Sequence, residues 1–420
     1  MRRFAIIALS AFLLLCSCSA PADKEFSPLF HTVPSRSLVV ARFGHLEHGL
    51  GLLLDTTSVF RSLDYGRLGN EEAILSYDFG AALIPLLSID AGKASADTSS
   101  AVARLLAQAS GKGLYAFYTA DLLAKRAAVL LSTSLTAIRE AEEHIRAGVS
   151  VMDAHGFSDA LSLCGGSALS VIQKNSSCSR WLPADFLRKN VARRDLNSFV
   201  AGVSEWTVLD FDSYSFDRVA LRFGNDGSKR YLSEMFAGLA AEECKAGAAV
   251  PAASDFVLGV AMKDVKLYSD AWQECLDVRA DLSKYNGRLA GLRKRCGKNP
   301  LVWMKEKDIR EIVVARWDGR EVQLVRGSSK VRKSEPSDNP YPGFVPALFG
   351  DAFRIADESC CASAAGWTAI GSSEDVSAWL EALPDRDSAF TGIPRTAKCY
   401  FINDEFSIVA DNKKTELHVN

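Results

Sequence analysis

The sequence contains two similar halves, and this repeat limits the folds open to the chain more than any other feature. The segment VPSRSLVVARF (33–43) resembles VPAASDFVLGVAM (250–262), and in each a Val-Pro pair precedes an apolar, strand-like run. The Val-Pro pairs begin at 33 and 250, an offset of 217, and the later Arg-Leu pairs begin at 67 and 288, an offset of 221. A nearly constant offset of this size indicates two copies of one structural unit.

Each copy continues with a pattern of strand, turn and strand. EEAILSYDFGAALIPLLSI (71–89) corresponds to IREIVVARWDGREVQLVRG (309–327), in which Asp318-Gly319 is typical of a tight hairpin. A strand and an amphipathic helix follow in both copies, and Ser372 or Ser373 can cap the second of these helices. Neighbouring strands joined by hairpins pair antiparallel. The predicted fold class is therefore α+β: two related units, each a mostly antiparallel sheet with helices on one face.

The two copies differ after their common part. The first copy runs on through WTVLDF (206–211) and DRVALRF (217–223) to a predicted helix at 231–241 that covers the sheet. The second copy shows no counterpart of this piece in its sequence. The sequence therefore predicts a first unit at 31–247, with an extra tail of strands and a helix, and a shortened second unit at 248–420.

A shortened second unit would leave one edge of its sheet uncovered. Edge strands have unpaired backbone N–H and C=O groups, which can pair with another chain. We therefore expect a protein partner to dock at the C-terminal sheet edge, within 403–420. Charged side chains on an edge strand discourage pairing with another chain. This segment has three of them, Lys413, Lys414 and Glu416.

The N-terminus is typical of an export signal. Two arginines precede an apolar run from Phe4 to Leu15, which at about 12 residues is shorter than the roughly 20 of a membrane span. Leu15-Cys16-Ser17-Cys18 resembles the bacterial lipobox. That resemblance implies that 1–17 is a signal peptide and that Cys18 carries the lipid, whereas Cys16 is discarded. An ordinary signal peptide with two incidental cysteines is the alternative.

Lipidation would anchor the mature chain to a membrane, because two or more acyl chains hold a protein stably. Residues 18–30 would then form a tether, and we expect an outer-membrane location that faces either the periplasm or the surface. Removal of 1–17 leaves 47 Lys and Arg (49 − 2) against 51 Asp and Glu, a net charge of −4. No basic domain is evident from this composition, so nucleic acid is not an expected partner.

The cysteines after Cys18 meet an oxidising compartment if the chain is exported, so disulfides can persist there. Two apolar stripes flank Lys284 and predict an antiparallel helix pair with its turn at that residue. Cys275 and Cys296 would then lie roughly level across the pair, which makes a Cys275–Cys296 disulfide one reading and buried free thiols the other. The adjacent Cys360 and Cys361 are expected to point to opposite faces of a strand.

Motifs for catalysis or metal binding are weak throughout the sequence. GHLEHG places His45, Glu47 and His48 close together, but a zinc site needs further ligands and no HExxH motif occurs. LCGGS (163–167) lacks the G-x-S-x-G pattern of a nucleophile elbow and is more typical of a turn or bulge. Trp206, Trp303, Trp317, Trp367 and Trp379 lie in strand or helix patterns, which are more typical of a core than of a sugar-binding platform. The sequence therefore predicts no catalytic residue, no metal and no cofactor.

Four segments carry a resemblance to a known family. The segments are LLSTSLTAIREAEEHIRAGVSVMDAHGF, VPAASDFVLGVAM, DESCCASAAGWTAIGSSEDVSAWL and NPYPGFVPALFG. They resemble segments of uncharacterised Bacteroidales lipoproteins close to the DUF3352-type domain. The resemblance implies an envelope location and an α+β architecture, and it assigns no catalytic role. The predicted function is a membrane-anchored envelope lipoprotein that acts as a binding or scaffold module. A hydrolase of envelope glycan or peptidoglycan, and an envelope assembly or folding factor, are the alternatives.

Overall fold

The computed structural model of the chain describes most of the residues from 26 onward. The predicted tether at 18–30 is too long, because Leu29 and Phe30 are buried in the core of the first unit. The described ranges are 26–50, 58–79, 83–92, 96–122, 126–165, 168–176, 202–211, 218–224, 227–328, 333–383, 390–404, 406–411 and 415–419. They form two compact units: 26–176 with 204–224, and 202–203 with 227–419. Cys16 and Cys18 lie outside the described residues.

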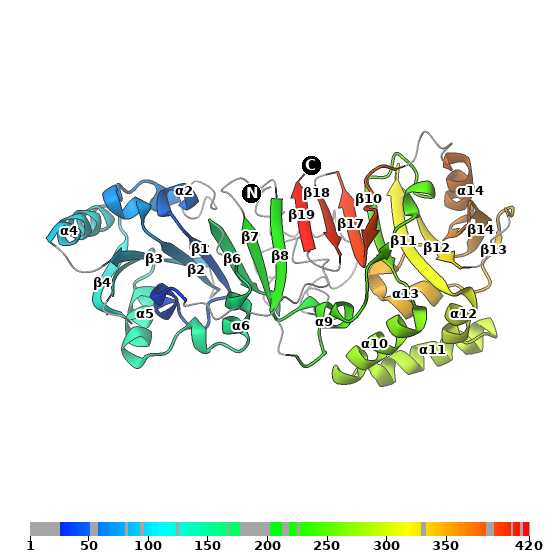
Figure 1. The fold of residues 1–420 in the computed structure, drawn as a ribbon, viewed down its shortest axis with the longest axis horizontal. Coiled ribbons are helices and arrows are strands. Elements are labelled where there is room, and N and C mark those ends of the chain that lie inside the picture. Colours follow the sequence, from blue (N-terminus) through cyan, green and yellow to red (C-terminus); the bar gives the residue numbers. More distant parts are fainter. Residues whose placement is uncertain are drawn as a thin grey trace. The chain divides into compact units, whose positions relative to one another are not determined.

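The first unit is built on an antiparallel sheet (Figure 1). Neighbouring strands pair in the order β4 (Tyr115–Leu122), β5 (Arg126–Ser132), β3 (Leu83–Gly92), β2 (Ala73–Phe79), β1 (Val39–Phe43), β6 (Leu169–Lys174), β7 (Trp206–Phe211) and β8 (Arg218–Gly224). Alternate residues of these strands form one side of a hydrophobic core, as Val40 and Ile172 do across the β1–β6 pair. Trp206 is fully buried in this core and packs edge-on against Phe157.

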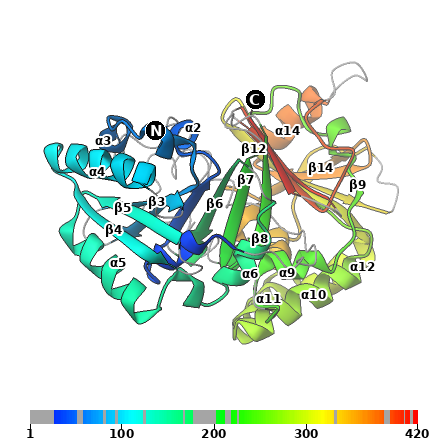
Figure 2. The same ribbon diagram turned by 60° about the vertical axis from the view of Figure 1, so that its left-hand side comes forward.

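Helices pack on this sheet and complete its core. They are η1 (Pro28–Thr32), α2 (Leu46–Leu50), α3 (Ser58–Arg61), η3 (Gly66–Asn70), α4 (Ala96–Gly111), α5 (Leu135–Ala147), η5 (Val151–Asp153) and α6 (Phe157–Ser162). Figure 2 shows α4 and α5 flanking β4 and β5. Ser134 caps α5 by accepting from the Ala137 N–H, and Gly148 ends the helix in the left-handed conformation, at φ 66°.

The second unit has its own antiparallel sheet. Its strands pair in the order β13 (Ser337–Asp338), β14 (Cys360–Ala364), β15 (Trp367–Gly371), β12 (Arg320–Gly327), β11 (Ile309–Trp317), β10 (Phe256–Ala261), β17 (Cys399–Asn403), β18 (Phe406–Ala410) and β19 (Thr415–Val419). A separate short pair joins β9 (Glu242–Glu243) to β16 (Thr396–Ala397). Lys413 and Lys414 lie outside the described residues.

The helices of the second unit pack against both faces of its sheet. They are α9 (Leu232–Ala237), η7 (Ala246–Ala248), α10 (Val265–Val278), α11 (Leu282–Cys296), α12 (Pro300–Lys307), α13 (Phe344–Phe349), η8 (Asp351–Phe353) and α14 (Ser373–Ala382). Val257 packs with Trp379 of α14 in one core. The next residue, Leu258, points to the opposite face of the strand, where it meets α9, α10, α11 and α13.

The repeat predicted from the sequence is confirmed by the strand order. β1 lies between β2 and β6, and β10 lies between β11 and β17 in the same antiparallel arrangement. β3–β5–β4 in the first sheet corresponds to β12–β15–β14 in the second. The fold class is therefore α+β, with two related sheet units.

One part of the repeat interpretation is wrong. β18 follows β17 and β19 follows β18, as β7 follows β6 and β8 follows β7, so the second unit has counterparts of both strands of the supposed extra tail. The sequence comparison missed them because 175–205 separates β6 from β7, whereas only 404–405 separates β17 from β18. A constant offset cannot align segments across such different connections.

The helix expected to cover the first sheet also differs from expectation. α9 is shorter than the predicted 231–241 and belongs to the second unit, whose main segment begins at Gly227 instead of at 248. The ring of Phe236 in α9 packs edge-on against Tyr268 of α10, with 6.0 Å between the ring centroids. Apolar contact with α10 therefore assigns this helix to the second unit.

Local predictions in the second unit are confirmed. Trp317 pairs with Arg320 across a two-residue turn in which Asp318 and Gly319 have φ values of 48° and 75°. This is the left-handed geometry for which an Asp-Gly pair is favoured. Ser372 caps α14, because its hydroxyl accepts from the Asp375 N–H at 3.0 Å.

Within the described ranges, none of the helices combines the length and the apolar character needed to cross a membrane.

Candidate functional site

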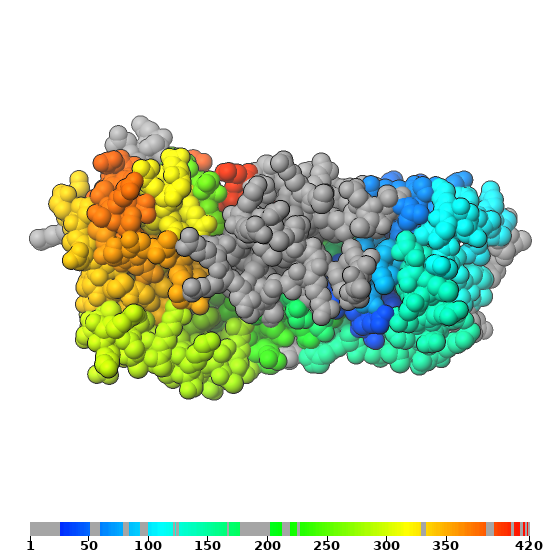
Figure 3. Space-filling model, turned by 180° about the vertical axis from the view of Figure 1, so that it is seen from behind, coloured from blue at the N-terminus to red at the C-terminus, as the bar shows by residue number. Residues whose placement is uncertain are grey.

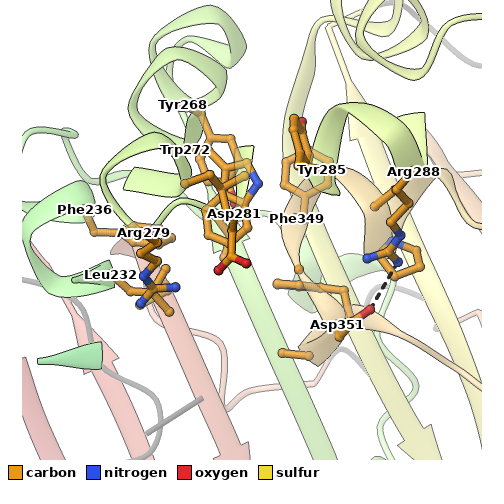
Figure 4. Close-up of a pocket in the computed structure, with 18 of the residues that line it drawn as sticks. Leu232, Phe236, Tyr268, Trp272, Arg279, Asp281, Tyr285, Arg288, Phe349 and Asp351 are labelled. Carbon is orange, nitrogen blue, oxygen red and sulfur yellow. Dashed lines mark hydrogen bonds and ion pairs between the residues drawn. The ribbon is translucent and has the colours of Figure 1, made fainter. Parts of the chain in front are cut away.

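The second unit contains a cavity of ≈ 280 Å³ between its helices and its sheet (Figure 4). Leu258 and Val260 of β10 and Cys399 of β17 form its floor. The walls come from α9, α10, α11, α13 and the turn after α13. They contribute Leu232, Phe236, Tyr268, Trp272, Leu276, Tyr285, Pro346, Ala347, Phe349 and Phe353. The cavity is therefore assembled from segments that lie far apart in the sequence.

The interior of the cavity is mainly aromatic. Tyr268 lies at the centre of the cluster, 5.1 Å from Phe349 and 6.0 Å from Phe236 between ring centroids. Both distances lie in the range of favourable aromatic pairs, so these rings hold one another in place. An interior of this kind gains binding free energy mainly by removing apolar ligand surface from water.

A few polar atoms interrupt the apolar lining. The indole Nε1 of Trp272 is buried and has no hydrogen-bond partner among the described residues. Burial raises the pKa of Tyr285 to about 12, and burial also raises the pKa of Tyr268, so both phenols keep their protons at neutral pH. Because an unpaired buried donor costs free energy, a ligand acceptor at Trp272 would recover that cost.

Charged side chains surround the opening of the cavity. Figure 4 shows Arg279 and Arg288 on opposite sides, with Asp281 between them. Arg288 is paired with Asp351 at 3.1 Å, and Arg354 also binds Asp351, at 2.6 Å. Although burial acts to raise it, these two arginines hold the pKa of Asp351 below its ordinary value. Arg288 is therefore already engaged by a carboxylate, whose negative charge it shares with Arg354.

Arg279 has a different environment. Its Nε donates to the Arg230 carbonyl and its Nη2 to the Gly202 carbonyl, both at 2.6 Å. Carbonyl oxygens are neutral, so they fix the position of the guanidinium without compensating its charge. Within the described part of the chain, no carboxylate pairs with Arg279 at ion-pair distance.

The chain that follows α10 is strongly basic, whereas α10 itself, which also lines the cavity, carries one Lys against three Asp and Glu. The segment 279–310 contains ten Lys and Arg against three Asp and Glu, in a chain whose formal net charge is −2. Its exposed cations include Lys284 in the first turn of α11 and Arg293, Lys294 and Arg295 in the last turn. Figure 3 shows this helical region, in yellow-green, at the surface of the second unit. It adds positive charge on the α11 side of the cavity.

The described structure forms none of the sites that sequence motifs suggested. The His45 ring contacts the Asn70 carbonyl at 2.9 Å and stacks edge-on with His48. Across the described ranges, no three His, Cys, Asp or Glu side chains are grouped to hold a metal ion. Trp206, Trp303, Trp317, Trp367 and Trp379 are buried, as predicted for core residues.

The possible disulfide is not formed. Cys275 and Cys296 are both free thiols, and the turn of the helix pair lies at 279–281 instead of at Lys284. Cys275 is therefore close to the turn, whereas Cys296 ends α11, about 21 Å along that helix at 1.5 Å per residue. Cys360 and Cys361 are also free, and they alternate between buried and half-buried sides of β14, as expected.

The cavity offers binding groups more than catalytic ones. Its lining includes the carboxylates of Asp281 and Asp351 and the buried thiol of Cys399, but no histidine, serine or threonine among the described residues. Asp351 is engaged by two arginines, so it does not have the raised pKa of a general acid.

Comparisons with family models, curated proteins and solved structures returned no match for this chain.

Proposed function

We propose that the protein is a membrane-anchored envelope lipoprotein whose second unit binds a small, mainly apolar molecule. The cavity under α10 and α11 is the observation that carries this proposal. It combines a concave aromatic interior with a small number of polar groups, which is the usual character of a small-molecule site. The lipid anchor at Cys18 follows from the lipobox-like sequence and would hold this site at a membrane surface.

The size of the cavity sets the affinity to expect from apolar contact. A volume of ≈ 280 Å³ is close to the lower end of the roughly 300–1,000 Å³ typical of ligand pockets. Burial of about 200 Å² of apolar ligand surface would contribute about 5 kcal/mol at about 25 cal/mol per Å². About 5 kcal/mol corresponds to a Kd of roughly 0.2 mM. The costs of association reduce the net free energy further, so weak binding, in the millimolar range, is expected.

Filling the cavity should weaken binding strongly. Ala347 is buried in the lining, and Ala347→Phe places an aromatic ring where the ligand would lie. We expect the neutral fluorescent probe N-phenyl-1-naphthylamine to bind residues 19–420, which keep every described residue. We expect Ala347→Phe to weaken this binding by about tenfold or more, which corresponds to at least about 1.4 kcal/mol.

Ala356→Phe is the matched control for this experiment. Ala356 is exposed and lies outside the lining, so the same chemical change there should leave probe binding unchanged. Thermal unfolding of both variants separates a filled cavity from a damaged fold. Equal binding by Ala347→Phe and the unchanged protein, or no binding by either, would contradict the proposal.

A further inference from the structure

We infer that the molecule bound in the cavity is an amphipathic anion, with its apolar part among the aromatic rings and its negative group beside Arg279 and Lys284. This inference rests on the proposed function, because it specifies the ligand of the same site. Arg279 lines the wall near α9, and Lys284 lines it from α11. The two cations therefore converge on one opening from different elements.

Arg279 has the properties of a prepared anion site. Two backbone carbonyls fix its guanidinium in place, and they use two of its five N–H donors. The remaining donors have no partner among the described residues. A carboxylate, sulfonate or phosphate would supply both hydrogen-bond acceptors and the missing negative charge. Because the guanidinium is already held, the anion would not have to order it on binding.

The position of Lys284 is electrostatically unfavourable for its own helix. It lies in the first turn of α11, where the positive end of the helix dipole disfavours a cation. It is exposed and forms no ion pair with a described residue. Arg293, Lys294 and Arg295 in the last turn stabilise the helix through its dipole, but that explanation does not extend to Lys284. An anion at the opening does account for its position.

The carboxylate of Asp281 acts against this assignment, since it lies between the arginines in Figure 4. Asp281 occupies the N-cap position of α11, but its side chain makes no capping hydrogen bond. Arg288 and Arg354 share the one negative charge of Asp351, and Arg279 and Lys284 outnumber Asp281 at the opening. The basic residues of 279–310 add a positive field that attracts anions, and salt should weaken it. The opening therefore favours an anion over a cation.

Two probes with one ring skeleton test this inference. 8-Anilinonaphthalene-1-sulfonate carries the rings of N-phenyl-1-naphthylamine and one added sulfonate. We expect residues 19–420 to bind the anionic probe more tightly than the neutral probe at low salt. Lys284→Gln should weaken the anionic probe by about threefold and Lys284→Glu by about tenfold, whereas the neutral probe should change little.

Lys266→Gln is the matched control. Lys266 is likewise an exposed lysine in the first turn of a helix, α10, but it does not line the cavity. It should leave both probes unaffected. Asp281→Asn should strengthen the anionic probe. Equal affinities for the two probes, or equal effects of Lys284→Glu on both, would overturn the inference and leave the proposed function standing. Failure of both probes to bind would overturn both.

Discussion

Cys18→Ser should release the protein from the membrane into the soluble fraction, whereas Cys16→Ser should leave it membrane-bound. The lipobox resemblance places cleavage directly before Cys18, so its thiol becomes the acceptor of the lipid. A serine hydroxyl is a much weaker nucleophile than a thiolate and should not replace it. Because stable anchoring takes more than one acyl chain, loss of the modification should move nearly all of the protein between fractions.

Fractionation of cells that express each variant measures this effect. Cys16 lies within the predicted signal, so Cys16→Ser controls for a general disturbance of export. Mass spectrometry of the mature N-terminus distinguishes a lipidated Cys18 from an ordinary cleavage site. A Cys18→Ser protein that remains membrane-bound, or a mature N-terminus without lipid, would exclude the anchor.

The parts of the fold that sequence predicted are those fixed by local chemistry. The Asp318-Gly319 hairpin depends on two residues that tolerate positive φ, and the cap of α14 depends on one hydroxyl. Strand patterns repeated at a near-constant offset revealed the two units. The hairpin and the cap each depend on a few consecutive residues, where short-range physical rules apply. Each repeated strand pattern is likewise short, although its two copies begin about 220 residues apart.

The cavity could not be predicted in the same way. It brings α9 and β17 together, and these are more than 150 residues apart in the chain. Periodicity also placed the turn of the helix pair at Lys284, because Lys284-Tyr285-Asn286-Gly287 is turn-like in composition. In the fold, Tyr285 is buried as a cavity wall and α11 continues through Gly287. Tertiary packing therefore overrides the local preference there.

One signal for the site was present in the sequence. Arg293-Lys294-Arg295 and its neighbours make 279–310 strongly basic, although the composition of the whole chain is slightly acidic. A count over the whole chain hides this asymmetry, whereas a count over each predicted element reveals it. It would have indicated an electropositive stretch over α11 and α12, but not the aromatic cavity beneath α11.

A second strong effect is expected at Glu311, a fully buried carboxylate in β11. Its Oε2 accepts from the Lys245 backbone N–H at 2.9 Å and from Arg326 Nε at 3.1 Å, and its Oε1 accepts from the Tyr400 hydroxyl at 2.9 Å. These three donors come from separate parts of the second unit. Glu311 therefore joins β12, β17 and the segment before η7 to β11.

Glu311→Ala should lower the free energy of unfolding by about 3–5 kcal/mol, the usual cost of removing one partner from a buried ion pair. The substitution leaves the three donors unpaired and opens a space in the core. Glu311→Gln keeps an acceptor of similar shape, so it should cost clearly less. Glu243→Ala is the control, because its pair with Lys245 is exposed and should contribute at most about 1 kcal/mol. Denaturant unfolding measures all three, and a small loss for Glu311→Ala would contradict the prediction.

The pH dependence of stability should also identify Glu311. Burial raises its pKa above the ordinary 4.5, and the hydrogen bonds and the charge of Arg326 offset this only in part. Between 4.5 and that raised pKa, the folded state binds more protons at this site than the unfolded state, so the stability contribution of Glu311 falls as pH rises. Glu311→Gln lacks this titration. We therefore compare the unfolding free energy of the unchanged protein with that of Glu311→Gln at each pH. The difference, unchanged protein minus variant, should decrease with pH above 4.5 and then level off. An increase across that window would show instead that the carboxylate is stabilised as an ion.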